Sequence, residues 1–186
     1  MEKPKIGIVI STTRPGRIGP KIAQWYLDQV TSRDDAEFEL IDLKEYALPF
    51  LDEPEMPGKQ LYELESTKQW SRVVDGLDGF VFVVAEYNNG YPAPLKNAID
   101  TIYKEWNNKP VAFIGYGSIG GARAIEQLIP VTVKIDMIAR SRTAIKLLDP
   151  RRMWEGDQIK AEHMRGNVQS MTDDLVWWTK FLRAAR

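Results

Sequence analysis

The chain contains no cysteine and only one histidine, His163, among its 186 residues. The absence of cysteine excludes disulfides, thiolate zinc sites, iron–sulfur clusters and a cysteine nucleophile. One histidine cannot build a multi-histidine metal site, so we predict no metal ion. His163 lies in a polar stretch and is expected to be an exposed loop residue.

Long apolar runs and an excess of charge are also missing. No run approaches the roughly 18–20 apolar residues that span a bilayer, and the first apolar run stops at Ile10, too early for a signal-peptide core. The 25 basic and 26 acidic residues give a net charge of −1, which favours neither nucleic acid nor an acidic membrane surface. We therefore expect a cytoplasmic protein with no nucleic-acid partner and no membrane insertion.

The organisation of the chain is typical of one ordinary globular domain. Thirteen glycines and eleven prolines are spread along the sequence rather than pooled, so no long disordered segment is predicted. The length suits a single core, and no internal repeat is visible. We predict a single domain over residues 1–186.

Short β-branched runs alternate with amphipathic segments. Strands are predicted at 5–10, 37–42, 79–85, 110–115 and within 136–147, and helices at 19–30, 59–76, 95–102, 122–129 and 168–182. This alternation predicts an α/β fold, a doubly wound, five-stranded parallel sheet with helices on both faces. Ligands of such sheets bind outside the carboxyl ends of the strands.

The loop after the first strand, residues 11–19, is rich in phosphate-binding groups. It has three hydroxyls, two guanidiniums and two glycines directly before a predicted helix. Free N–H groups at a helix N-terminus favour an anion, and arginine meets phosphate oxygens bidentately. No Gly-Lys-Ser/Thr follows, which excludes a P-loop. A phosphate monoester fits best; the alternative is a solvated turn capped by Ser and Thr.

The loop after the third strand, residues 85–94, combines two tyrosines with two asparagines. Tyrosine offers a stacking face and asparagine can bond the edge of a flat heteroaromatic ring. Asn89-Gly90 predicts a tight turn and the two prolines a helix start. An ordinary turn with half-buried tyrosines is the alternative.

The loop after the fourth strand, residues 115–121, matches G-x-G-x-x-G, and Asp136 lies near the spacing of a ribose-binding acid. Both features suggest a dinucleotide fingerprint. However, three βα units precede this loop, and too little chain follows it for a second mononucleotide half. The other interpretation is that small residues let the backbone pass close to a ligand anchored elsewhere.

Together these loops resemble the NAD(P)H-dependent FMN reductase family over nearly the whole chain. Residues 11–14 are similar to the family's Gly-Ser-x-Arg phosphate loop, with Ser11 in place of the glycine, and Arg17 stands where the family often has serine. Residues 85–88 resemble its Pro-Glu-Tyr-Asn motif with Ala85 for proline, 95–98 its Leu-Lys-Asn-Ala helix, and 116–121 its Tyr-Gly-Gly-x-Gly-Gly segment.

The resemblance implies a flavodoxin-like fold, bound FMN, and NADPH or NADH as electron donor. Electrons would pass to a small-molecule acceptor such as a flavin, quinone, azo dye or metal oxyanion, in a homodimer or homotetramer. The flavin carries the chemistry, so no catalytic acid or base is assigned. The implied cofactor-binding residues are Ser11, Thr12, Arg14, Arg17, Ile18, Glu86, Tyr87, Asn88, Asn89, Tyr116, Gly117, Ser118, Gly120 and Gly121.

Two other functions stay open at this point. One is a passive flavodoxin-type electron carrier, although flavodoxins are usually more acidic than this chain. The other is a protein that binds NAD directly through the glycine-rich loop.

Two further groups of residues have alternative interpretations. The first is aromatic and is expected to pack in the core, with an oligomer contact as the alternative: Trp177, Trp178 and Phe181. The second is basic and is expected to be solvated or subunit-facing, with the extra phosphate of the nicotinamide donor as the alternative: Arg140, Arg142, Arg151 and Arg152.

Overall fold

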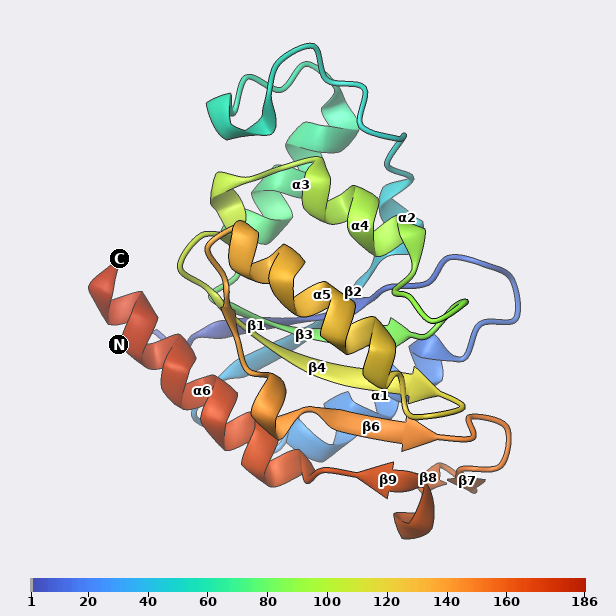
Figure 1. The fold of residues 1–186 in the computed structure, drawn as a ribbon. Helices are drawn as coiled ribbons and strands as arrows, with labels where there is room; N and C mark the ends of the chain where they lie inside the picture. The colour runs from blue at the N-terminus through green and yellow to red at the C-terminus, as the bar shows by residue number, and fades with distance from the viewer. Residues whose placement is uncertain (1) are drawn as a thin grey trace.

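A computed structural model describes residues 2–186 of the chain as alternating strands and helices (Figure 1). The helices are α1 (Gly19–Val30), α2 (Leu43–Tyr46), α3 (Glu65–Asp75), α4 (Ala93–Asp100), α5 (Ala122–Lys134) and α6 (Val168–Ala185). The strands are β1 (Lys5–Ile10), β2 (Glu37–Asp42), β3 (Gly79–Ala85), β4 (Pro110–Gly117), β5 (Ile138–Ala139), β6 (Ile145–Leu148), β7 (Trp154–Glu155), β8 (Gln158–Ile159) and β9 (Met164–Arg165).

The main sheet has the strand order β2-β1-β3-β4-β6-β9. The pairings along β2-β1-β3-β4-β6 are all parallel, as predicted, although the sheet has seven strands rather than five. The single strand predicted within 136–147 is replaced by two, β5, which pairs with the start of β4, and β6. Strand β9, which was not predicted, lies at the edge of the sheet and is antiparallel to β6. The chain moves outward from β1 to β2 and then returns to β3 on the other side, so β1 and β3 flank the topological switch point.

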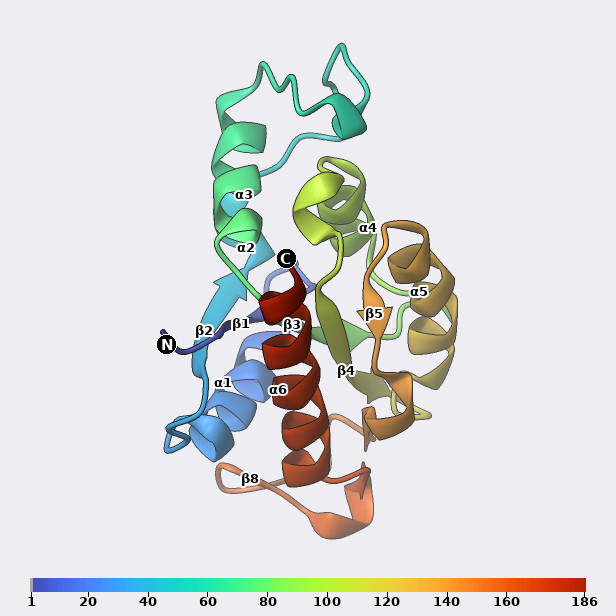
Figure 2. The same ribbon diagram turned by 90° about the vertical axis from the view of Figure 1, so that its left-hand side faces the viewer.

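Helices cover both faces of the sheet, as Figure 2 shows. One apolar cluster joins alternate residues of β1, such as Ile6 and Ile8, to α1 and α6. The other cluster joins the opposite face to α3, α4 and α5, and contains the fully buried Trp70 and Trp106. The strands are therefore packed on both faces, and this packing fixes the positions of their carboxyl ends.

The helix predicted at 59–76 begins later, at Glu65. The chain before it makes an exposed excursion over residues 47–64, tied down by the buried carboxylate of Glu105. This carboxylate accepts hydrogen bonds from the hydroxyls of Tyr62, at 3.0 Å, and Ser71, at 2.6 Å. Burial and the neighbouring Glu105 raise the pKa of Tyr62, which keeps it a donor. The bond of Tyr62 fixes the end of the segment to Glu105, and the bond of Ser71 fixes α3 to the same carboxylate.

The core prediction for the aromatic group on α6 was wrong for two of its members. Trp177 and Phe181 are 58% and 55% exposed, and their rings stack in parallel with centroids 5.5 Å apart. The buried side of α6 is formed instead by residues such as Met171 and Leu175. The aromatic spacing was helical, but it marks the outer face of the helix.

Candidate functional site

The carboxyl ends of β1, β3, β4 and β6 surround a cavity of about 1090 Å³. This volume lies slightly above the range of about 300–1,000 Å³ that is usual for small-molecule sites. The lining brings together the three loops singled out in the sequence and one later segment. Its residues are Arg14, Gly16, Ile18, Lys21, Ala85, Glu86, Tyr87, Tyr116, Gly117, Ser118, Asp149, Pro150, Arg151 and Trp154.

The first loop presents unpaired donors beside a helix N-terminus. Ser11 and Thr12 are buried, and among residues 2–186 neither hydroxyl has a hydrogen-bond partner. Helix α1 starts with Gly19-Pro20, has no acidic residue in its first turn, and has no side-chain cap. Buried polar groups normally find partners, and a helix N-terminus attracts anions. The loop therefore has the donor set of a phosphate site.

Gly19 lets this loop approach the end of β4. A Cβ atom built at Gly19 would lie 2.9 Å from Oγ1 of Thr12 and 3.0 Å from the hydroxyl oxygen of Tyr116. Burial raises the pKa of Tyr116 to about 12, so this hydroxyl stays protonated at neutral pH. Two hydroxyls from different loops thus converge at the start of α1, and a larger residue there would separate them.

The two arginines of the first loop have different surroundings. Arg14 borders the cavity, and its Nε donates to the hydroxyl of Tyr87 at 3.3 Å. Arg17 instead makes a bidentate pair with Asp42 at the end of β2, with N···O distances of 2.7 and 2.5 Å, and donates to the backbone carbonyl of Thr12. Hydrogen bonding to Asp42 raises the pKa of Arg17. Arg14 can meet a ligand, whereas Arg17 braces the loop.

The second loop forms a tight turn, one residue earlier than predicted. Tyr87 and Gly90 exchange backbone hydrogen bonds of 2.9 Å in both directions. The central residues are Asn88 and Asn89, with φ of 49° and 67°. Asparagine tolerates this left-handed region, which a two-residue turn of this kind requires at both positions. The turn places Tyr87 at the cavity wall.

Arg123 joins the second loop to helix α5 and was not predicted from the sequence. Its guanidinium donates to Glu86 at 3.1 Å and also to the side-chain oxygen of Asn89, and its backbone N–H donates to Glu86 at 3.2 Å. The Glu86 side chain is only 7% exposed. Gln127, one turn further along α5, donates to the carbonyl of Asn89 at 2.8 Å. Helix α5 therefore fixes the turn, and Glu86 caps α5.

The third loop uses glycine for close backbone packing. Gly121 has a φ of 72°, and a Cβ there would lie 2.6 Å from the backbone nitrogen of Tyr116. Gly120 has a φ of 73°, and its Cβ would lie 2.7 Å from Cβ of Lys146 on β6. Asp136 precedes β5, which pairs with the start of β4, so it lies at the opposite edge of the sheet. The dinucleotide interpretation of this loop therefore fails.

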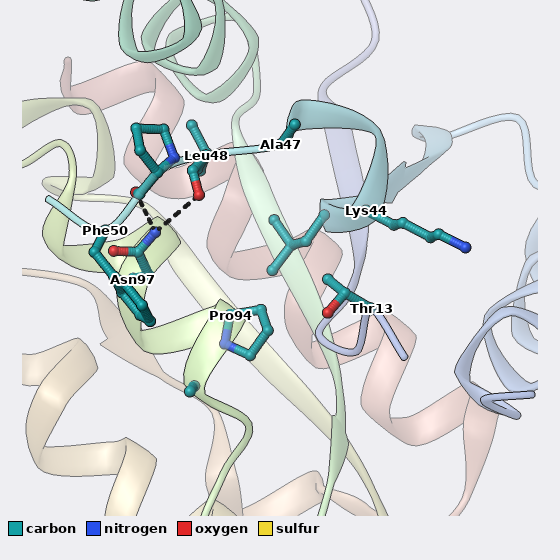
Figure 3. A pocket seen from close by; sticks show the side chains of 10 residues that line it. Thr13, Lys44, Ala47, Leu48, Phe50, Pro94 and Asn97 are labelled. Carbon is teal, nitrogen blue, oxygen red and sulfur yellow. Dashed lines mark hydrogen bonds between the residues drawn. The ribbon is translucent and has the colours of Figure 1, made fainter. Parts of the chain in front are cut away.

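A second cavity, of about 470 Å³, borders the first loop at Thr13 (Figure 3). Thr13 borders it together with residues 43–50 and the start of α4. Asn97 of α4 holds the far wall: its amide nitrogen donates to the carbonyl of Pro49 at 2.7 Å, and its oxygen accepts from the N–H of Leu51 at 3.2 Å. The asparagine of the Leu-Lys-Asn-Ala segment thus has a structural role.

The arginines of the basic group defined in the sequence, residues 140–152, have different surroundings in the structure. Arg140 makes a bidentate pair with Asp174, with both distances 2.7 Å, and stacks over Trp178. Arg152 lies 3.8 Å from Asp149. Only Arg151 of this group borders the large cavity.

Comparison with known proteins agrees with this geometry. Residues 4–146 match the family model of NADPH-dependent FMN reductase. An NAD(P)H-dependent FMN reductase of Schizosaccharomyces pombe is 38% identical over 182 residues, covering 96% of this chain and 84% of that protein. A 2-hydroxy-1,4-benzoquinone reductase of a Burkholderia species is 25% identical over 185 residues, covering 95% and 96%.

Among solved structures, the flavoenzyme NAD(P)H:(acceptor) oxidoreductase FerB of Paracoccus denitrificans matches with a TM-score of 0.70. It is 21% identical and covers 95% of this chain and 97% of its own. This likeness supports the flavodoxin-like fold. No helix within residues 2–186 has the length and apolar character needed to cross a membrane. The chain belongs to the NADPH-dependent FMN reductase family and is an FMN-dependent oxidoreductase that uses NAD(P)H as donor.

Proposed function

We propose that the large cavity holds FMN with its phosphate on the first loop and its ring system between the second and third loops. The observation that carries this proposal is the pair of buried hydroxyls of Ser11 and Thr12, which have no hydrogen-bond partner within residues 2–186 and lie beside an N-terminus of α1 that is free of acidic residues. A phosphate dianion would satisfy these donors and the helix end together. The residue set implied by the family resemblance stays our prediction for the binding site, except that Arg17, paired with Asp42, is proposed to act through the backbone of Thr12.

The side chains of this protein bind and orient the FMN. The chemistry of accepting a hydride and releasing electrons would be supplied by the cofactor when it is bound. Arg14 adds a charge-assisted contact at the phosphate end of the cavity. Tyr87 forms the wall for the ring, and Arg123 holds the Asn88-Asn89 turn that follows it in place. Tyr116 stays protonated because burial raises its pKa. Its neutral hydroxyl can therefore donate a hydrogen bond to the phosphate without repelling it.

For the electron acceptor we propose a small flat oxidant, with quinones as the first class to test. The Burkholderia relative is named for reduction of a hydroxybenzoquinone, and three aromatic side chains, Tyr87, Tyr116 and Trp154, line the cavity. A free flavin or an azo dye fits the same description of shape. An acceptor screen with a quinone, FMN and an azo dye at equal concentration ranks them by kcat/KM.

We also propose a homodimer or homotetramer. Large apolar side chains are exposed on the excursion, with Phe50 at 83% and Met56 at 71%, and the stacked pair on α6 adds a second apolar face. Exposed patches of this kind mark interaction sites. A cytoplasmic location stays a prediction from the sequence.

The proposal is tested by anaerobic titration of the purified protein with NADPH and with NADH. We expect a yellow protein with one FMN per chain whose visible band bleaches on adding a nicotinamide. Stoichiometric FMN that neither nicotinamide bleaches would contradict the enzyme and support a passive electron carrier. Colourless protein that binds NADH but no FMN would contradict the cofactor site itself.

A further inference from the structure

The segment after β6 forms an outer wall of the large cavity. This wall lies outside the three loops that we propose bind FMN. Residues 149–159 run from the end of β6 through the hairpin β7–β8, which Figure 1 shows beside the end of β6. Four of these residues border the cavity: Asp149, Pro150, Arg151 and Trp154. None belongs to the residue set implied by the family resemblance. The cavity therefore extends beyond the predicted flavin contacts.

Lys21 fixes this hairpin to helix α1. Its ammonium lies 4.2 Å from the ring centroid of Trp154, donates to the carbonyl of Gly156 at 3.2 Å, and lies 3.6 Å from Asp157. Three contacts of one side chain hold the wall in place although the hairpin itself has only two short strands. The residues that precede the hairpin are thereby positioned at the cavity rim.

Arg151 stands out among the charges of this rim. It borders the cavity and makes no ion pair or side-chain hydrogen bond within residues 2–186, whereas its neighbour Arg152 lies beside Asp149. The one carboxylate deeper in the cavity wall, Glu86, is already paired with Arg123. The rim thus carries a cation with no anion assigned to it, separate from Arg14 at the phosphate loop.

We propose that Arg151 binds a phosphate group at the adenosine end of the nicotinamide donor and thereby favours NADPH over NADH. This rests on the proposed function, because the nicotinamide ring must reach the flavin ring between the second and third loops. The adenosine end of the donor then extends outward, toward the rim where Arg151 lies. A guanidinium recognises a phosphate monoester bidentately, and NADPH differs from NADH by one such group.

The test uses FMN-loaded protein and 2′,5′-ADP, a redox-inactive ligand that carries the phosphate found only on NADPH. Calorimetry should give an affinity for 2′,5′-ADP that falls roughly tenfold in Arg151→Gln. The FMN dissociation constant should be unchanged. The matched control is Arg152→Gln, which removes the same charge one residue away, outside the cavity lining, and should change neither affinity.

A kinetic measurement gives the second readout. The NADPH concentration that half-saturates anaerobic flavin reduction should rise in Arg151→Gln by about the same factor as the dissociation constant of 2′,5′-ADP. The corresponding NADH concentration should stay close to that of the wild type. Equal losses in both arginine variants, or in both nicotinamides, would overturn the proposal. Weaker FMN binding in Arg151→Gln would also overturn it and assign Arg151 to the cofactor phosphate. Wild-type protein that binds FMN but not 2′,5′-ADP would overturn it and leave the proposed function standing.

Discussion

Arg17 and Asp42 form a bidentate pair that connects the loop after β1 to the end of β2, with N···O distances of 2.7 and 2.5 Å. Both side chains are largely buried, and the same guanidinium donates to the backbone carbonyl of Thr12. The Arg17–Asp42 pair therefore sets the position of the loop that we propose binds the phosphate. Arg17 acts on the site through the backbone of the loop.

Asp42→Asn should weaken FMN binding although Asp42 does not line the cavity. The substitution leaves the Arg17 guanidinium without its bidentate partner, and the loop around Thr12 loses its brace. We expect the FMN dissociation constant to rise about fivefold to twentyfold and the free energy of unfolding to fall by about 1–3 kcal/mol. Fluorescence titration and urea unfolding measure the two effects. Glu39→Gln, an exposed change on the same strand, should alter neither; an equal effect there would contradict the account.

Gly19→Ala should weaken FMN binding despite the general preference of helices for alanine. A Cβ at this position would lie within 3.0 Å of the hydroxyls of both Thr12 and Tyr116, so one of them must move. At an open helical site the change would stabilise by about 0.5–1 kcal/mol. We expect lower FMN affinity together with no gain in thermal stability. Gly58→Ala, where nothing lies within 4 Å, is the control; a Gly19→Ala protein with unchanged affinity would rule out this close approach.

Arg123→Ala should destabilise the protein more than Glu86→Gln. The first change leaves the carboxylate of Glu86, 7% exposed, without its cationic partner, whereas the second keeps an acceptor for the N–H of Arg123. Because Arg123 is itself 46% exposed, we expect a loss of only about 1–2 kcal/mol. A double-mutant cycle in urea should give a coupling energy of about 1 kcal/mol. Strict additivity of the two changes would show that the contact does not hold the second loop to α5.

Lys109 predicts a specific pH dependence of stability. It is 4% exposed and its ammonium donates to the carbonyls of Val74 and Asp75 at the end of α3, at 2.8 and 3.1 Å. Burial lowers its pKa to about 8, below the value of about 10.4 in an unfolded chain. Between these values the unfolded chain binds more protons than the folded protein, so stability rises with pH.

The free energy of unfolding of the wild type should therefore rise relative to Lys109→Met, by about 2 kcal/mol from about pH 7.5 to about pH 10. Chemical unfolding across this range measures the difference. Lys104→Met, an exposed lysine nearby, should follow the wild type. A difference that stays constant with pH would contradict the lowered pKa.

Much of the fold could be predicted from the sequence because buried parallel strands are continuous apolar runs. The buried strands at 5–10 and 79–85 have the predicted bounds, as does the more exposed edge strand at 37–42, and α1 begins at the predicted Gly19-Pro20. The late start of α3 could not be predicted, since the excursion before it is held by Glu105 from a distant part of the chain. The helix predicted to end near 129 continues through Pro130 to Lys134.

The predicted site was incomplete for a similar reason. The loops at the strand ends were identified because their hydroxyls, glycines and tyrosines stand close together in sequence. Arg123 and Trp154 occupy unremarkable positions, and their roles depend on contacts with Glu86 and Lys21 that only the tertiary structure creates. Exposure of Trp177 depends in the same way on which side of α6 meets the sheet.

The central claim, that the loop after β1 binds the phosphate of FMN, is tested most directly by comparing FMN with riboflavin in wild type and Arg14→Ala. A lost charge-assisted hydrogen bond corresponds to about 1.5–3 kcal/mol, so the FMN dissociation constant should rise roughly tenfold to a hundredfold. The riboflavin constant should hardly change, because riboflavin has no phosphate. Equal weakening of both ligands, or unchanged binding of FMN, would contradict the account.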